Sequence, residues 1–333
     1  MICPHCHKDV KAKERTGHRC SKCRREFALD PKENDLKLHD LRLHRLTTQL
    51  SDSGRYAYTS QQLYWAAAGK HLKSAATGSA MLGGSFVALF TGTVFLFVAI
   101  GTESFVAFLP ALLLYGGVIL AVTLRLTGVW HKKVRISTTP QAFAANLNSW
   151  HRVYGGYPPG LVRQLPSVAP PARPVLAVLS PDSSVLTCLA ANGVPQRLNV
   201  HLADRPAHVP QGVPVLLLHD ASVAGYAFAA KMRAMWPGRR VMDASPRPAA
   251  VKAAKGAAKL RDVPPPQEHL AALRGQLSDA DLDWLAKGWW SPVAAIKPAS
   301  LLQRVQTAVD RLGAADPDTR RAASVGFLTW PAA

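Results

Sequence analysis

The fold of the largest part of this chain is decided by residues 213–222, which read Val-Pro-Val-Leu-Leu-Leu-His-Asp-Ala-Ser. Residues 213–219 form a short apolar run, as expected for a strand that is buried on both faces of a sheet. A helix-like stretch, Val223–Met235, follows after only three residues, 220–222. A buried strand that passes directly into a helix predicts a βα unit, the repeating element of α/β domains.

The same alternation continues on both sides of this unit. We expect strands at 175–179, 198–202 and 239–242, and helices at 183–191 and 249–260. This order predicts a three-layer α/β domain over residues 175–262 with a mostly parallel sheet. Cys188 lies alone in an apolar part of this region, and we expect it to be a small core residue.

The ends of two predicted strands carry polar residues that suit a ligand pocket. Asp182 follows the first strand, and Asp220 and Ser222 follow the strand at 213–219. Because α/β domains bind ligands beyond the carboxyl ends of their strands, we expect Asp182, Asp220 and Ser222 to line such a pocket. The simpler alternative is that Asp220 only caps the helix that follows it.

The element order and this corner resemble the Toprim fold of topoisomerases and primases, over about residues 175–245. That family holds Mg²⁺ with a glutamate after its first strand and an Asp-x-Asp pair after its third. Here Asp220 matches the first aspartate, Ser222 stands in place of the second, and Ser180-Pro181-Asp182 contains no glutamate. The resemblance implies a metal-dependent phosphodiester or nucleotide enzyme with a reduced acidic site, and magnesium is expected only in that case.

Positive charge is concentrated in the same domain. The chain carries a net charge of +19, of which residues 125–333 contribute +13, and residues 226–261 contain nine Lys and Arg against Asp243 alone. Such a balance favours nucleic acid, anionic lipid headgroups or phosphorylated small molecules as ligands, and a basic face that only meets water is the alternative. The candidate polyanion-binding residues are Lys231, Arg233, Arg239, Arg240, Lys252, Lys255 and Lys259.

A helical C-terminal region is expected over residues 267–333, after the break at Pro264-Pro265-Pro266. Helices are predicted at 267–276, 278–287 and 298–312, with Ser278 as the N-cap of the second because acidic residues follow it in the first turn. Trp284, Trp289 and Trp290 lie close together in sequence. We expect them to close a small core rather than to stack on nucleic-acid bases.

Four of the five cysteines form two tight pairs at the start of the chain. Cys3 and Cys6 enclose Pro-His, Cys20 and Cys23 enclose Ser-Lys, and thirteen residues separate the pairs. Two thiolates from each turn suit one tetrahedral metal ion. The segment resembles the zinc-ribbon family over about residues 1–30, which implies a zinc ion held by Cys3, Cys6, Cys20 and Cys23.

This zinc is expected to be structural, because four protein ligands leave no open position for a substrate. His5, His7 and His18 are nearby and are the alternative ligands, but four cysteines suffice without them. Free thiolates for metal also indicate a reducing compartment. Redox-active thiols or another metal are the other interpretations of the four cysteines.

The segments between the head and the α/β domain divide into three by composition. Residues 31–73 predict a small α+β unit with a strand at 35–46, where apolar and polar residues alternate, and a helix that begins near Thr59. Residues 127–174 predict a juxtamembrane segment and a Pro-rich linker, since 155–174 contain six prolines and no acid.

Residues 74–126 predict a two-helix transmembrane hairpin. Both 81–100 and 105–124 are uncharged and long enough to cross a bilayer, which takes about 20 residues, and Glu103 lies between them. Lys70, Lys73, Arg125, Lys132 and Lys133 flank the pair, so the positive-inside rule predicts an integral membrane protein with both termini in the cytoplasm.

These features predict a multi-domain, membrane-anchored zinc protein whose basic cytoplasmic α/β domain binds a polyanion or a protein partner. A scaffold or sensor role is favoured over catalysis. The Toprim-like enzyme is the alternative, and the number of carboxylates at the corner separates the two, because Asp220 is the one acid that matches the family pattern. Oligomeric state does not follow from the sequence.

Overall fold

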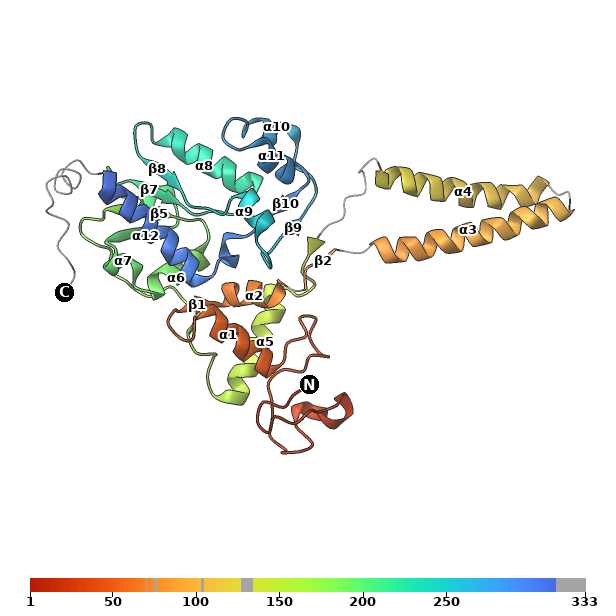
Figure 1. The fold of residues 1–333 in the computed structure, drawn as a ribbon, viewed down its shortest axis with the longest axis horizontal. Helices are drawn as coiled ribbons and strands as arrows, with labels where there is room; N and C mark the ends of the chain where they lie inside the picture. The colour runs from red at the N-terminus through yellow and green to blue at the C-terminus, as the bar shows by residue number, and fades with distance from the viewer. Residues whose placement is uncertain (70, 75–76, 103–104, 127–133, 316–333) are drawn as a thin grey trace.

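The computed structural model describes residues 1–69, 71–74, 77–102, 105–126 and 134–315. It comprises a small N-terminal head (residues 1–30), a helical core, a long helical hairpin and an α/β domain (Figure 1). Lys70, Glu103, Lys132 and Lys133, which entered the prediction of membrane orientation, lie outside the described residues, as does the end of the C-terminal region from residue 316.

The α/β domain is built on a four-stranded parallel sheet. Its strands are β5 (Leu176–Leu179), β6 (Val200–Ala203), β7 (Val215–Leu217) and β8 (Val241–Asp243), in the order β6-β5-β7-β8. All three pairings are parallel, which confirms the predicted α/β domain with a mostly parallel sheet. The chain leaves β5 toward β6 on one side and then crosses to β7 on the other, so the topological switch lies between β5 and β7.

Helices cover both faces of this sheet. On one face α6 (Ser183–Ala191), α7 (Val194–Arg197) and α12 (Pro298–Ala315) pack over Leu176 and Val178. On the other face α8 (Val223–Met235) packs over Ala177 and Leu179. Successive strand residues point to opposite faces, which explains why one continuous apolar strand supplies two cores. The bounds of α6 and α8 are those that the sequence predicted.

The region after β8 differs from the prediction. Helix α9 spans only Pro248–Ala253, because the chain turns at Gly256, which has a φ of +80°. The predicted helix at 249–260 is therefore too long. Lys255 and Lys259 lie beyond the helix and do not share a face with Lys252.

The C-terminal helices close a small core beside the sheet. They are α10 (Gln267–Ala271) and α11 (Asp279–Ala286), and Ser278 caps α11 as predicted by accepting a hydrogen bond from the Asp281 amide at 3.2 Å. Trp284 is buried in this core, as predicted. Trp290 is partly buried and donates its indole N–H to Asp262 at 2.9 Å.

A separate helical core lies between the head and the α/β domain. It consists of α1 (Asp40–Leu50), α2 (Ser60–Ala68) and α5 (Pro140–Tyr154). The strand predicted at 35–46 is wrong, because the buried residues of α1 recur every three to four positions, the period of a helix. Helix α5 falls within 127–174, so that segment contributes to a core in addition to linking domains.

The helical core is joined to the α/β domain by polar contacts beside a pair of short parallel strands. Strand β1 (Tyr58–Thr59) pairs with β4 (Leu161–Val162) inside the Pro-rich segment. The Thr59 hydroxyl contacts that of Ser184 at 2.6 Å in a buried position, and Asn192 bonds both backbone groups of Ala57 at 2.9 Å. Cys188, a core residue as predicted, lies beside this joint.

A second, antiparallel sheet carries the base of the hairpin. Its strands are β2 (Lys73–Ser74), β3 (Val134–Arg135), β9 (Leu260–Arg261) and β10 (Trp289–Trp290), in the order β10-β9-β3-β2. Helices α3 (Thr77–Thr102) and α4 (Phe105–Leu126) leave from this sheet and pack against each other away from the body (Figure 1). The Thr93 hydroxyl contacts that of Tyr115 at 2.8 Å between them.

The predicted transmembrane hairpin at 74–126 is wrong. A helix needs about 20 consecutive apolar residues to cross a bilayer, and in the described ranges no helix is long and apolar enough to do so. Several large apolar side chains of α3 and α4 are exposed, among them Phe97, Leu112 and Leu113. Three further predictions rested on these spans and are wrong with them. They are the integral-membrane location, the membrane as a partner crossed twice, and the cytoplasmic placement of both termini.

Candidate metal centre and ligand pocket

The four N-terminal cysteines lie on two knuckles that repeat the same local geometry. In each knuckle the backbone amide of the first cysteine donates a hydrogen bond to the carbonyl five residues later. Cys3 donates to Lys8, and Cys20 donates to Arg25, both at 3.0 Å. Four residues after the first cysteine of each pair, His7 and Arg24 turn the chain back with φ of +56° and +57°. Each turn therefore presents both of its thiols to the same side.

The sulfur atoms of the two knuckles meet in one cluster. The Sγ atoms of Cys3 and Cys23 are 3.8 Å apart, those of Cys6 and Cys20 are 3.9 Å apart, and all four lie within 4.8 Å of one another. Four sulfurs that surround a zinc ion at about 2.3 Å on the corners of a tetrahedron are about 3.8 Å apart. The cluster is compatible with a zinc-ribbon-like metal site.

The environment of the thiols supports ion binding at this cluster. Burial raises the pKa of Cys3 to about 12 when no cation is present. Burial also raises the pKa of Cys20, but hydrogen bonds from the backbone of Cys23 and Lys22 outweigh it and lower that pKa to about 7. A cation is needed to hold four thiolates together, so metal binding is expected to release protons.

The histidines near the cluster have other partners. The Nε2 atom of His5 lies 2.7 Å from the carbonyl of Glu26, and that of His18 lies 2.7 Å from Glu33. His7 is exposed. Among the described residues, the group that could hold a metal contains the four cysteines and none of these histidines.

A buried ion pair fixes the head beside its metal cluster. Arg15 donates from Nε and Nη2 to the two carboxylate oxygens of Asp30 at 2.6 Å and 3.0 Å, and both side chains are almost fully buried. Asp40, at the start of α1, accepts from the amides of Ala28 and Leu29 at 2.8 Å and from the Tyr154 hydroxyl of α5. The head is thereby tied to the helical core.

A second candidate site lies at the topological switch of the α/β sheet. A cavity of 540 Å³ opens beyond the carboxyl ends of β5 and β7, and Asp182, Asp220 and Ser222 all line it. The three residues that the sequence nominated are thus brought together at one place. Gln61 of α2 also lines the cavity, so the helical core contributes to its wall.

The carboxylates of this cavity are partly engaged by the protein. Asp182 caps α6 by accepting from the Ser184 amide at 2.8 Å, and Asp220 accepts from the Val293 amide at 2.8 Å. Asp220 is therefore not the cap of α8; Ser222 is, because its hydroxyl accepts from the Gly225 amide at 3.0 Å. Burial raises the pKa of both carboxyls, and Asp220 raises that of Asp182 further.

His219 ends the strand predicted at 213–219 and also lines this cavity, but it was not among the predicted site residues. Its side chain is buried, with Nδ1 2.8 Å from the carbonyl of Asp220 and Nε2 3.2 Å from the carboxylate of Asp243. Both ring nitrogens face acceptors. Asp243 also accepts from Arg233 at 3.3 Å and from the Ser245 amide at 2.9 Å, so its charge is balanced inside the protein.

Three of the seven predicted polyanion-binding residues have structural roles. Arg239 donates to two carbonyls in the loop before β7 and covers the Trp236 ring at 5.0 Å. Arg233 pairs with Asp243 at 3.3 Å. Lys259 donates to a backbone carbonyl of α9 at 2.7 Å.

The other four basic residues are exposed. They come from α8, the turn before β8, α9 and the loop that follows it, and they are Lys231, Arg240, Lys252 and Lys255. Within the described part of the chain, none of their side chains has a hydrogen-bond or ion-pair partner. They remain available to an external anion.

Comparison of the chain with protein-family models, curated proteins and solved structures finds no match.

Proposed function

We propose that this chain is a zinc-stabilised binding protein, without catalytic activity, whose basic α/β domain binds nucleic acid. The observation that carries the zinc half of this proposal is the cluster of four thiols, with sulfur separations of 3.8 Å and 3.9 Å. All four positions around the ion would be filled by Cys3, Cys6, Cys20 and Cys23, so the ion would organise the head and would activate no substrate.

The binding half rests on charge. Residues 125–333 contribute +13 to a net charge of +19, and Lys231, Arg240, Lys252 and Lys255 are exposed in the described structure without internal partners. Flexible exposed lysines and arginines contact phosphate groups by charge and release counterions, which makes such binding independent of sequence and sensitive to salt.

Metal analysis tests the zinc half. We expect the purified protein to hold one zinc ion per chain, and Cys20→Ser to lose it, with hydrogen exchange in residues 1–30 rising toward that of an unfolded segment. Cys188→Ser is the matched control, because this cysteine lies in the α/β core and should leave the zinc content unchanged. A normal metal content in Cys20→Ser would refute the assignment.

A salt titration tests the binding half. We expect the full chain to bind a labelled duplex with an affinity that falls steeply as salt rises. Replacement of Lys231, Arg240, Lys252 and Lys255 by Gln should reduce the slope of log K against log salt by up to about 3.6, since each phosphate contact contributes about 0.9. A double Lys287→Gln, Lys297→Gln variant, exposed at other sites, should retain most of the slope. A slope that the fourfold variant leaves unchanged would exclude this surface.

The second candidate function is a magnesium-dependent phosphodiester enzyme, and the observation that favours it is that Asp182 and Asp220 line one cavity. Each carboxylate keeps capacity for a ligand after its one amide bond, and Mg²⁺ is bound in many sites by one or two carboxylates together with substrate phosphates. Mg²⁺-dependent cleavage of the labelled duplex that Asp220→Asn abolishes would establish it. Binding without cleavage in the wild-type chain would exclude it.

A further inference from the structure

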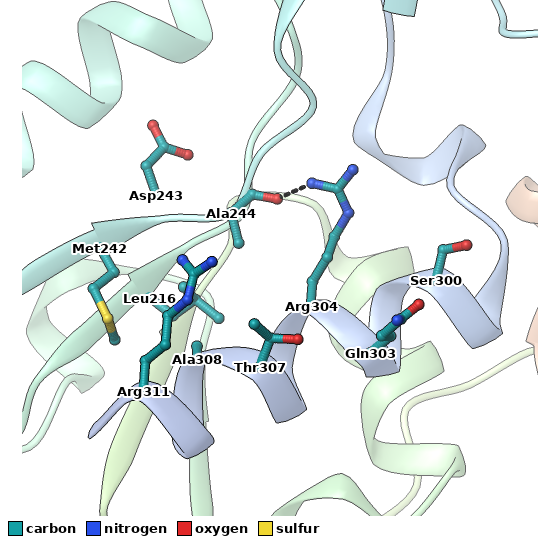
Figure 2. Close-up of a pocket in the computed structure, with 10 residues that line it drawn as sticks. All are labelled: Leu216, Met242, Asp243, Ala244, Ser300, Gln303, Arg304, Thr307, Ala308 and Arg311. Atoms are coloured by element: carbon teal, nitrogen blue, oxygen red, sulfur yellow. Dashed lines mark hydrogen bonds between the residues drawn. The ribbon is translucent and has the colours of Figure 1, made fainter. Parts of the chain in front are cut away.

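The α/β domain has a second cavity, which shares no lining residue with the cavity at Asp182 and Asp220. It has a volume of 640 Å³ and lies, open to solvent, between α12 and the end of the sheet formed by β7 and β8 (Figure 2). One side of α12 supplies its polar wall through Ser300, Gln303, Arg304, Thr307 and Arg311, at the spacing of a single helix face. The volume falls in the range of about 300–1,000 Å³ that small-molecule sites occupy.

Two guanidinium groups project from this helix toward the end of β8 (Figure 2). Arg304 is half-buried and is held in place by Nη1, which donates to the backbone carbonyls of Ala244 and Ser245. Its Nε and Nη2 atoms have no acceptor among the described residues. Arg311 is exposed, and its side chain has no hydrogen-bond or ion-pair partner among the described residues.

The one acid among the described residues that line the cavity, Asp243, interacts with Arg304 by charge but does not balance both arginines. Asp243 lines the cavity, but its carboxylate is already occupied by His219, Arg233 and the Ser245 amide. The cavity therefore has an excess of positive charge and several unused N–H donors. Guanidinium groups bind phosphate well, because their parallel N–H bonds match two phosphate oxygens.

The opposite wall is apolar. Met242 of β8 and Leu216 of β7 line it; Met242 is partly exposed, and Leu216 is almost fully buried behind it. A bare inorganic anion would leave this surface without a contact. A ligand that carries both a phosphate and a flat apolar group would use both walls, and a thioether such as that of Met242 contacts aromatic rings favourably.

We propose that the cavity between α12 and β8 is a binding site for a nucleotide-like phosphate monoester, with Arg304 and Arg311 on the phosphate and Met242 against the base. This site is independent of the nucleic-acid surface proposed above, because it shares none of the residues Lys231, Arg240, Lys252 and Lys255. It also differs from the cavity that Asp182 and Asp220 line.

Calorimetric titration of the full chain with AMP, adenosine and inorganic phosphate tests the proposal. We expect saturable binding of AMP, with adenosine and inorganic phosphate each at least tenfold weaker. Arg311→Gln should weaken AMP binding about tenfold without a change in unfolding temperature, because Arg311 has no partner within the described residues. Arg304→Lys should also weaken AMP binding, since a lysine ammonium lacks the parallel N–H donors of the guanidinium.

The controls separate this site from the others. Lys297→Gln removes an exposed charge near the start of α12 outside the cavity, and it should change AMP affinity less than twofold. The fourfold Gln variant of the nucleic-acid surface and Asp220→Asn should likewise retain AMP binding. Absence of saturable AMP binding, equal binding of adenosine, or full affinity in Arg311→Gln would each overturn the proposal.

Discussion

At the scale of single residues, Gly225 allows α8 to lie close to the turn at His219 and Asp220, beside the candidate cavity. A Cβ at this position would lie 2.2 Å from the Asp220 carbonyl and 2.6 Å from Nδ1 of His219, both of them fixed atoms at the start of α8. We expect Gly225→Ala to lower the free energy of unfolding by about 2 kcal/mol or more, because the turn and His219 must move apart. Urea denaturation measures this, and Gly156→Ala, where no atom lies within 4 Å, should change it by less than about 0.5 kcal/mol.

Asp243 makes stability depend on pH at the same sheet edge. Burial opposes its ionisation, but hydrogen bonds and charge from His219, together with the Ser245 amide, lower its pKa from 3.8 to about 2. Because the pKa of the folded chain is lower, the ionised form stabilises the fold by about 2 kcal/mol. This contribution is complete above the unfolded pKa and disappears as the pH falls through about 2.

The measurement compares unfolding of the wild type and Asp243→Asn between pH 6 and pH 2. The stability difference between the two should be largest near pH 6 and should shrink in acid. The exposed Asp283→Asn controls for metal loss at low pH, which affects all variants equally. A stability difference that stays constant over this range would contradict the assigned role of Asp243.

At the scale of elements, local patterns predicted the α/β domain well. Helices α6 and α8 were predicted at their observed bounds, since each follows an apolar strand and begins at Asp182 or Ser222, residues that cap helices through their own side chains. Asp182, Asp220 and Ser222 could be grouped from sequence because parallel strands end at the same edge of a sheet. Helix α12 was likewise predicted from residue 298 onward.

The errors arose where one pattern permitted two interpretations. Residues 35–46 alternate because Leu36 and Leu38 lie in a buried turn region before α1, where Lys37 has a φ of +50°, and the helical period begins only at Asp40. No motif or spacing in the sequence indicated the cavity on α12. Arg304 contacts Ala244, at the end of β8, which lies 60 residues earlier in the sequence. Local sequence patterns do not reveal a contact between residues so far apart.

At the scale of the whole molecule, the helical core and the α/β domain are joined by few polar contacts, and Asn192 is central to them. Its Nδ2 donates to the carbonyls of Ala57 at 2.9 Å and Cys188 at 2.7 Å, and its Oδ1 accepts from the Ala57 amide at 2.9 Å. This side chain satisfies both backbone groups of Ala57 from across the joint. Each group left without a partner would cost about 1–3 kcal/mol.

We therefore expect Asn192→Ala to loosen the joint and to make opening of the helical core more frequent, while the α/β domain stays folded. Hydrogen exchange at 25 °C should become faster in α1, α2 and α5, by about 30-fold or more, while the strands β5 and β7 keep most of their protection, since their cores are separate. Asn148→Ala, which removes only an exposed contact with Tyr157, should leave exchange unchanged in both regions. Equal acceleration in both regions would mean that the helical core and the α/β domain unfold as one unit, and that Asn192 supports the whole molecule rather than the joint.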